Sequence, residues 1–176
     1  MHIGIAGIGK MGAAIGSRLL SQGYKVTVWN RTSVKAQSLL DAGAQWAPTP
    51  KALAESVDVV LTLLTNEAAL DQVYGAESGL LAGQVKGKTF IDMSTVRPAK
   101  PQEMAGLVQA VHAYFLECPV GGSVGPAKEG KLLGFVGGQA QDLARVHALL
   151  SVICRRVEHV GPHGAGATMK LAVNLP

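Results

Sequence analysis

A short apolar strand that runs into a glycine-rich turn at the N-terminus constrains this chain more than any other feature. Residues 2–6 are strand-like, residues 7–12 follow the pattern Gly-x-Gly-x-x-Gly, and a helical pattern then continues to about Gln22. In this context the glycines allow a tight turn, a close approach of the backbone to a pyrophosphate and close packing of helix on strand. The N-terminus of the helix favours an anion. We therefore expect a dinucleotide here, bound by Gly7, Ile8, Gly9, Lys10, Met11 and Gly12.

The second informative segment follows the next predicted strand, Lys25–Trp29. An NAD site usually carries Asp or Glu at this point, which binds the ribose 2′-hydroxyl and repels a 2′-phosphate. Here the residues are Asn30, Arg31 and Thr32. The planar guanidinium of Arg31 suits a phosphate, and its neighbours add neutral polar groups. We expect a preference for NADP over NAD; the alternative is that Arg31 is a solvated loop residue.

The composition is that of a folded domain that handles a small anionic ligand. The 176 residues are 48% hydrophobic and 16% charged, which suffices for a sizeable core in one domain. The net charge of +4 is scattered and only 5% of residues are aromatic, which argues against nucleic-acid binding. Cys118 and Cys154 suggest free thiols, and His159 and His163 complete no metal set. We expect a cytoplasmic protein without a metal, a membrane span or a signal peptide.

Strand and helix patterns alternate along the whole chain. Buried strands are expected at 2–6, 25–29, 57–63, 89–92, 114–119, 132–136 and 155–160. Helices are expected at 10–22, 33–42, 50–55, 66–74, 98–111, 140–151 and 167–174. Apolar strands that alternate with helices predict an α/β fold with a doubly wound, mostly parallel sheet of the Rossmann type. Ligands of such a sheet bind beyond the carboxyl ends of its strands.

Residues that follow two of these strands are candidates for ligand binding. Leu63 ends the strand predicted at 57–63, and Leu64 and Thr65 follow it; these residues could cover the ribose of the cofactor. Ser94 and Thr95 follow the strand predicted at 89–92. They could bind cofactor or substrate, or they could simply cap the helix that begins near residue 98.

A loop of small residues after the strand at 114–119 is a candidate anion site. Gly121, Gly122 and Ser123 expose several backbone N–H groups, and such a nest can hold a carboxylate. The alternative is a loop whose glycines only permit close packing against a neighbour.

The last helical segment carries the candidate catalytic pair. Lys170 and Asn174 are four residues apart and therefore share one face of the helix. Against the ligand crevice, Lys170 could exchange a proton with a substrate hydroxyl, because a buried lysine changes its pKa readily, while Asn174 orients the same oxygen. The alternative is that Lys170 is a solvated charge.

Together these segments resemble the NADP-binding domain of the β-hydroxyacid dehydrogenase family, which includes 3-hydroxyisobutyrate dehydrogenase and, more distantly, 6-phosphogluconate dehydrogenase. The resemblance extends from Gly4 to Asn174 and rests on four motifs, at residues 7–12, 92–95, 119–123 and 161–174. It implies that Lys170 is the catalytic residue, that Thr95 lies by the nicotinamide and that residues 119–123 form the substrate loop. The segment Asn30-Arg31-Thr32 looks like that of the NADP-preferring members.

Two departures from the family pattern affect what the resemblance implies. The serine of the family's substrate loop aligns with Gly121 here, and its second glycine aligns with Ser123, so the usual substrate assignment does not transfer. Family members also continue into an all-α domain that closes the active site and makes the dimer, and that domain is missing from these residues. We expect a dinucleotide-binding domain at 1–163, the start of an interdomain helix at 164–176, and a homo-oligomer at full length.

The function expected from these features is NADP-dependent hydride transfer between a small β-hydroxyacid and its semialdehyde or keto form. Lys170 would act as general acid or base, and Gly121, Gly122, Ser123 and Ser94 would contact the carboxylate substrate. Two alternatives stay open. One is an NADP-binding fragment without turnover, and the other is an enzyme like the imine reductases, which share the architecture but usually replace the lysine.

Overall fold

The computed structural model describes residues 1–175; Pro176, the last residue of the expected interdomain helix, lies outside the described part. The strands are β1 (His2–Ala6), β2 (Lys25–Trp29), β3 (Gln45–Trp46), β4 (Val59–Thr62), β5 (Thr89–Asp92), β6 (Tyr114–Glu117), β7 (Val120–Gly121), β8 (Leu132–Gly137) and β9 (Cys154–Gly161). The helices are α1 (Lys10–Ser21), the 3₁₀ turn η1 (Ser33–Ala36), α2 (Gln37–Asp41), α3 (Pro50–Ser56), α4 (Glu67–Gly75), α5 (Ala99–Ala110), α6 (Val124–Glu129), α7 (Ala140–Ile153) and α8 (Ala165–Val173).

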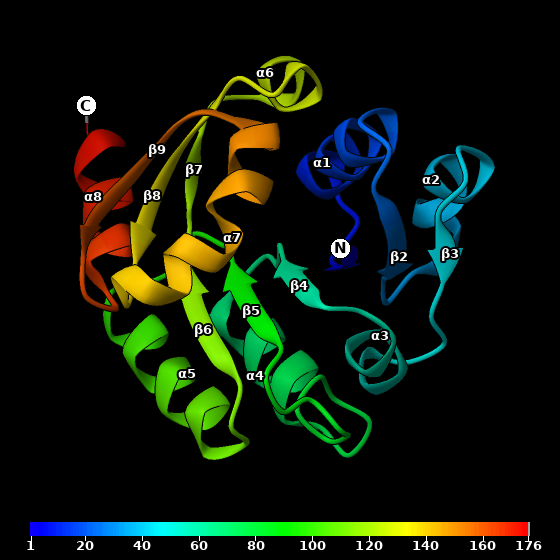
Figure 1. The fold of residues 1–176 in the computed structure, drawn as a ribbon, viewed down its shortest axis with the longest axis horizontal. Coiled ribbons are helices and arrows are strands. Elements are labelled where there is room, and N and C mark those ends of the chain that lie inside the picture. Colours follow the sequence, from blue (N-terminus) through cyan, green and yellow to red (C-terminus); the bar gives the residue numbers. More distant parts are fainter. Residues whose placement is uncertain (176) are drawn as a thin grey trace.

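The strands form one mixed sheet in the order β3-β2-β1-β4-β5-β6-β8-β7, with β9 paired to β8 (Figure 1). All pairs from β3 to β6 are parallel, whereas β8 runs antiparallel to β6 and to β7. The chain leaves β1 toward β2 on one side and reaches β4 on the other. The strand order therefore reverses between β1 and β4, which is where a doubly wound sheet binds its ligand. The predicted Rossmann-type α/β fold is confirmed.

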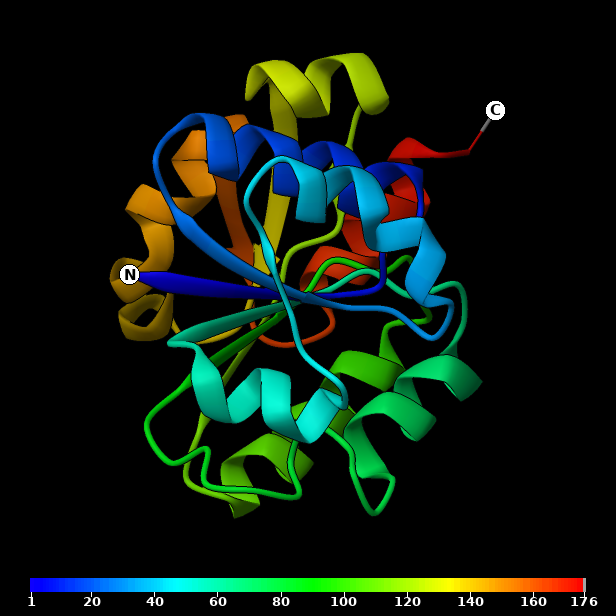
Figure 2. The same cartoon turned by 90° about the vertical axis from the view of Figure 1, so that its right-hand side faces the viewer.

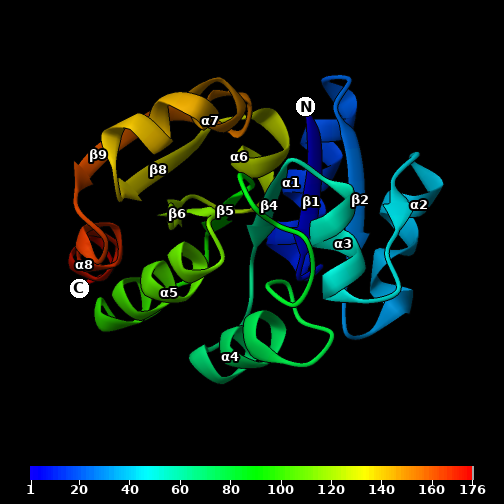
Figure 3. The ribbon, with the colours of Figure 1, turned by 60° about the horizontal axis from the view of Figure 1, so that its bottom comes forward.

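Helices cover both faces of the sheet because the parallel strands are apolar on both faces (Figures 2 and 3). Ile3 and Ile5 of β1 pack in a cluster on the face of α1, α6 and α7. Phe90 and Phe115, from β5 and β6, pack in a second cluster with α3, α4 and α5 on the opposite face. This alternation along each strand gives the molecule three layers.

The structure corrects several predicted boundaries. The strand predicted at 57–63 covers only Val59–Thr62, because Val57 caps the end of α3. The helix predicted at 33–42 is divided into η1 and α2. The two-residue strands β3 and β7 and the six-residue helix α6 were not predicted. Elements this short carry too few residues for a periodic pattern, and tertiary pairing decides them.

Candidate functional site

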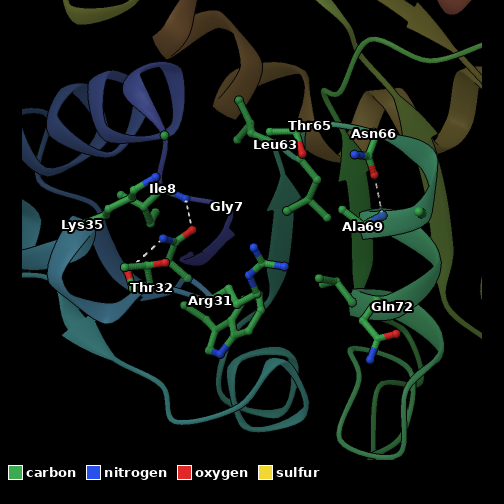
Figure 4. A pocket seen from close by; sticks show the side chains of 16 residues that line it. Gly7, Ile8, Arg31, Thr32, Lys35, Leu63, Thr65, Asn66, Ala69 and Gln72 are labelled. Carbon is green, nitrogen blue, oxygen red and sulfur yellow. Dashed lines mark hydrogen bonds between the residues drawn. The ribbon is translucent and has the colours of Figure 1, made fainter.

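A cavity of about 530 Å³ lies at the carboxyl ends of β1, β2 and β4, at the point where the strand order reverses (Figure 4). It is lined by the glycine turn, the segment after β2, the segment after β4 and one side of α4. The lining residues are Gly7, Ile8, Gly9, Trp29, Asn30, Arg31, Thr32, Lys35, Leu63, Leu64, Thr65, Asn66, Ala68, Ala69, Gln72 and Val73. The position is that expected for the ligand of a doubly wound sheet.

The glycine turn is built for close approach of backbone to backbone and to a ligand. Gly7 has φ of +106°, and a Cβ there would overlap the carbonyl oxygen of Leu63. A Cβ at Gly12 would overlap the carbonyl oxygen of Gly7, so α1 can lie this close to the turn only with glycine. A Cβ at Gly9 would meet nothing within 4 Å, so this glycine leaves open space at the cavity.

The start of α1 suits a diphosphate. Gly9 is the N-cap and offers no side chain to the free N–H groups of the first turn, and no acidic residue lies in that turn. Free N–H groups and the positive end of the helix dipole together favour an anion. The open space at Gly9 and this uncapped helix end therefore fit the pyrophosphate of a dinucleotide.

Positive side chains line the part of the cavity formed by the segment after β2. Arg31 and Lys35 both lie on the cavity and are exposed. In Figure 4 the guanidinium of Arg31 extends into the cavity, between Thr32 and the helix that carries Gln72. No lining residue is Asp or Glu. Lys35 was not predicted for the site; it lies in η1, three residues beyond Thr32, and reaches the same cavity.

Asn30 holds the glycine turn and the segment after β2 together. Its side-chain oxygen accepts a hydrogen bond from the N–H of Ile8 at 2.8 Å, and its amide group donates to the carbonyl oxygen of Thr32 at 2.9 Å (Figure 4). The amide is thus engaged within the protein. Asn30 shapes the cavity wall through these two bonds.

A buried polar network lies beneath the segment after β4. Asp92 is 1% exposed, and its Oδ1 accepts hydrogen bonds from the hydroxyls of Thr62 and Ser94, each at 2.8 Å. Ser94 Oγ in turn accepts the N–H of Leu64 at 2.9 Å. The hydroxyl of Ser94 therefore ties the end of β5 to the cavity wall, and the helix that follows is capped by Pro98 rather than by Ser94 or Thr95.

Burial raises the pKa of Asp92 from 3.8 to about 6. Its Oδ2 is buried and has no hydrogen-bond partner among the described residues, so no donor stabilises a negative charge on this oxygen. Because the pKa is higher in the folded state, the contribution of this group to stability is complete below the unfolded pKa of 3.8 and is lost as the pH rises through about 6.

We expect Asp92→Asn to flatten the dependence of stability on pH. Between about pH 4 and pH 8 the original chain should lose about 2 kcal/mol more unfolding free energy than the variant, because Asn does not ionise. Urea unfolding at both pH values measures this difference. The exposed Asp41→Asn variant serves as the control and should behave like the original chain. Equal pH dependence in all three proteins would contradict the expectation.

The structure brings together only part of the predicted site residues. On the cavity lie Gly7, Ile8, Gly9, Asn30, Arg31, Thr32, Leu63, Leu64 and Thr65. Outside its lining lie Lys10, Met11, Gly12 and Thr95, predicted for the cofactor, and Ser94, Gly121, Gly122, Ser123, Lys170 and Asn174, predicted for the substrate or catalysis. Gly121 belongs to β7, so the predicted loop is shorter than expected. Lys170 is half-buried on α8, and Asn174 caps the end of that helix.

Residues 2–161 match the family model described as the NAD binding domain of 6-phosphogluconate dehydrogenase. The chain belongs to this family. The fold, the reversal point and the cavity agree with this membership, so the chain has an NAD(P)-binding domain and the cofactor class predicted from the glycine turn is confirmed. The resemblance to 3-hydroxyisobutyrate dehydrogenase is confirmed as well by curated relatives of that name.

The chain is similar to one curated relative and two solved structures. The mitochondrial 3-hydroxyisobutyrate dehydrogenase of Bos taurus is 32% identical over 98% of this chain and 52% of its own length. The solved structure of Psf3 in complex with NADP+ and 2-OPP superposes with a TM-score of 0.93 at 32% identity, over 98% of this chain and 61% of that one. A reductive aminase from Aspergillus terreus in complex with NADPH and ethyl levulinate has a TM-score of 0.88 at 26% identity, over 98% and 59%. The chain thus spans about half to three-fifths of the length of these relatives.

The described part of the chain holds neither a cluster of metal-ligating side chains nor a helix suited to a membrane. Among residues 1–175, no three His, Cys, Asp or Glu residues gather where they could hold a metal ion. No helix in that part is both long enough and apolar enough to cross a membrane.

Proposed function

We propose that this chain is the cofactor-binding part of an NADP-dependent oxidoreductase that interconverts a small β-hydroxyacid, or a related hydroxyacid, and its semialdehyde or keto form. The observation that carries the proposal is the cavity at the strand reversal, where an uncapped helix start and two cations meet without a carboxylate. When bound there, the cofactor supplies or accepts a hydride. The remaining chemistry falls to side chains of the protein.

The choice of NADP rests on charge. Arg31 can bind a phosphate with two parallel N–H groups, and Lys35 adds a second cation to the same wall of the cavity. An Asp or Glu that would bind a free 2′-hydroxyl and repel a phosphate is missing from the lining. NAD remains the second choice.

Lys170 is the proposed general acid or base. It would hold a proton at Nζ and exchange it with the substrate oxygen, while Asn174, one helical turn further, would orient that oxygen. Gly122 and Ser123 are exposed and would bind the substrate carboxylate, while Thr95 is exposed at the end of β5 and would position the reacting groups. Imine reduction is the alternative reaction. The presence of a lysine at this position favours the oxidation or reduction of an alcohol and its carbonyl form instead.

The proposal extends to the oligomeric state of the full-length protein and to its location in the cell. Met169, Leu171, Val173 and Leu175 are exposed on and after α8. Apolar exposure at the end of the described chain is typical of a surface that packs against another part of an assembly, and we propose that some of these side chains are covered when the protein forms a homo-oligomer at full length. A cytoplasmic location, a domain boundary near residue 163 and the start of an interdomain helix beyond it stay predictions.

Arg31→Ala is expected to weaken the binding of NADPH much more than the binding of NADH. The affinity for NADPH should fall roughly tenfold to a hundredfold, because a charged hydrogen-bond partner of the phosphate is removed, while the affinity for NADH should change about twofold at most. Calorimetric titration with each cofactor measures both. Arg155→Ala removes an exposed arginine of β9 and should change neither affinity. Equal losses for NADPH and NADH in Arg31→Ala would remove the argument for NADP.

A further inference from the structure

The carboxylate of Glu117 closes the N-terminal end of α8. Glu117 is the last residue of β6 and is 1% exposed. Its Oε1 accepts hydrogen bonds from the N–H groups of Gly164 and Gly166, and its Oε2 accepts one from Ala167 at 3.1 Å. The helix has no side-chain cap of its own. Because a helix start carries unpaired N–H groups and a positive dipole end, the carboxylate satisfies both.

Three glycines make room for this contact. Gly137 pairs with Glu117 across β6 and β8, and a Cβ there would overlap the carboxylate. A Cβ at Gly166 would lie 2.5 Å from the carbonyl oxygen of Phe135. Gly164 has φ of +100° and lies against the carbonyl oxygen of Pro98. The glycines at the start of α8 therefore serve a contact inside the protein, which fixes the position of the helix along its axis.

Lys170 lies one turn beyond this contact. It follows Ala167 by three residues and Gly166 by four, so all three share one side of α8. The helix is only nine residues long, and the i→i−4 pattern of an α-helix links the backbone of Lys170 to that of Gly166. A displacement of the first turn is therefore transmitted to the backbone of Lys170.

We propose that Glu117 is the positioning residue for Lys170, setting the axial position and the rotation of α8 through its three backbone hydrogen bonds. The inference rests on the proposed function only in the role given to Lys170. Glu117 itself touches no ligand cavity described above; it acts by holding the start of the helix. It lies 47 residues from Gly164 in the sequence, which is why no local pattern points to it.

Glu117→Gln tests the contact while keeping the shape of the side chain. Its amide places an N–H where an oxygen accepts now, so amide hydrogen exchange at Gly164, Gly166 and Ala167 should accelerate roughly tenfold to a hundredfold. The first-turn amides of α7 should not change. Glu117→Asp keeps the charge and should restore part of the protection. Glu129→Gln removes an exposed carboxylate and is the matched control.

Lysine labelling tests whether the contact positions Lys170. Competitive acetylation read by mass spectrometry should label the half-buried Lys170 at least about threefold faster in Glu117→Gln, relative to the exposed Lys25, because a loosened helix exposes it. Glu117→Asp should reverse part of this change. A variant that destabilised the whole fold would instead raise the labelling rate of all half-buried lysines together.

Three outcomes decide the proposal. Faster exchange at the start of α8 together with faster labelling of Lys170 alone supports it. Unchanged exchange in Glu117→Gln overturns it, and so does faster exchange without a change at Lys170. Titration with NADPH is run in parallel and should be unaffected by the variant. If NADPH fails to bind the original chain, the proposed function fails, while exchange and labelling still decide the role of Glu117.

Discussion

Replacing Lys170 with alanine is expected to lower turnover by about 10²- to 10⁴-fold, the contribution usual for a general acid or base. The affinity for NADPH should stay within about twofold, because Lys170 lies on α8, away from the lining of the cofactor cavity. Turnover is measured as oxidation of NADPH with small semialdehydes and keto acids. The assay uses both the chain itself and a chimera continued by the part of the Bos taurus relative that lies beyond the matched region.

Lys25→Ala provides the control for this experiment. Lys25 is exposed at the start of β2. It lies at the amino ends of the strands, whereas the cavity lies at their carboxyl ends, so its removal should leave turnover unchanged. If Lys170→Ala kept full turnover, the lysine would not be the general acid or base. Loss of NADPH binding in Lys170→Ala would indicate a structural lysine instead.

Gly12→Ala is expected to damage both the fold and cofactor binding. The added Cβ would overlap the carbonyl oxygen of Gly7, and because both sides of this contact are backbone, α1 has to move away from the turn. We expect a loss of about 1–3 kcal/mol in the free energy of unfolding, as for overpacked sites. The affinity for NADPH should fall about a hundredfold. The start of α1 would move away from the glycine turn, and these two parts together form the expected pyrophosphate site.

Gly106→Ala is the matched control for Gly12→Ala. Gly106 also lies within a helix, α5, but a Cβ there would meet nothing within 4 Å. Alanine should therefore stabilise the chain by about 0.5–1 kcal/mol through helix propensity, with no change in NADPH affinity. If both variants behaved alike in urea unfolding and titration, close packing at Gly12 would not explain the glycine motif.

Features that depend on neighbours in the sequence could be predicted, and features that depend on distant contacts could not. The strand, turn and helix of residues 2–21 form a local unit, so the glycine spacing predicted both the fold and the cavity. The segment at Arg31 was predictable for the same reason. Lys35 was not predicted because it lies beyond the segment 30–32 and reaches the cavity only through the position of η1 in the fold.

The hydrogen-bond partners of the two buried carboxylates could not be predicted from the sequence. Asp92 bonds Thr62 from 30 residues away, and Glu117 bonds the start of α8 from 47 to 50 residues away. Such partners are chosen by the strand order, since Thr62 and Asp92 are register partners in β4 and β5. Ser94 was predicted to contact substrate, but its hydroxyl is engaged by Asp92 and Leu64. No pattern in one sequence reports this engagement.

Calorimetric titration of the chain with NADPH and, separately, with NADH tests the central proposal most directly. We expect both cofactors to bind in the cavity at the reversal of the strand order, with NADPH bound about tenfold or more tightly than NADH, because Arg31 and Lys35 line the cavity and would pair with a 2′-phosphate. Tighter binding of NADH, or no binding of either cofactor, would contradict the proposal.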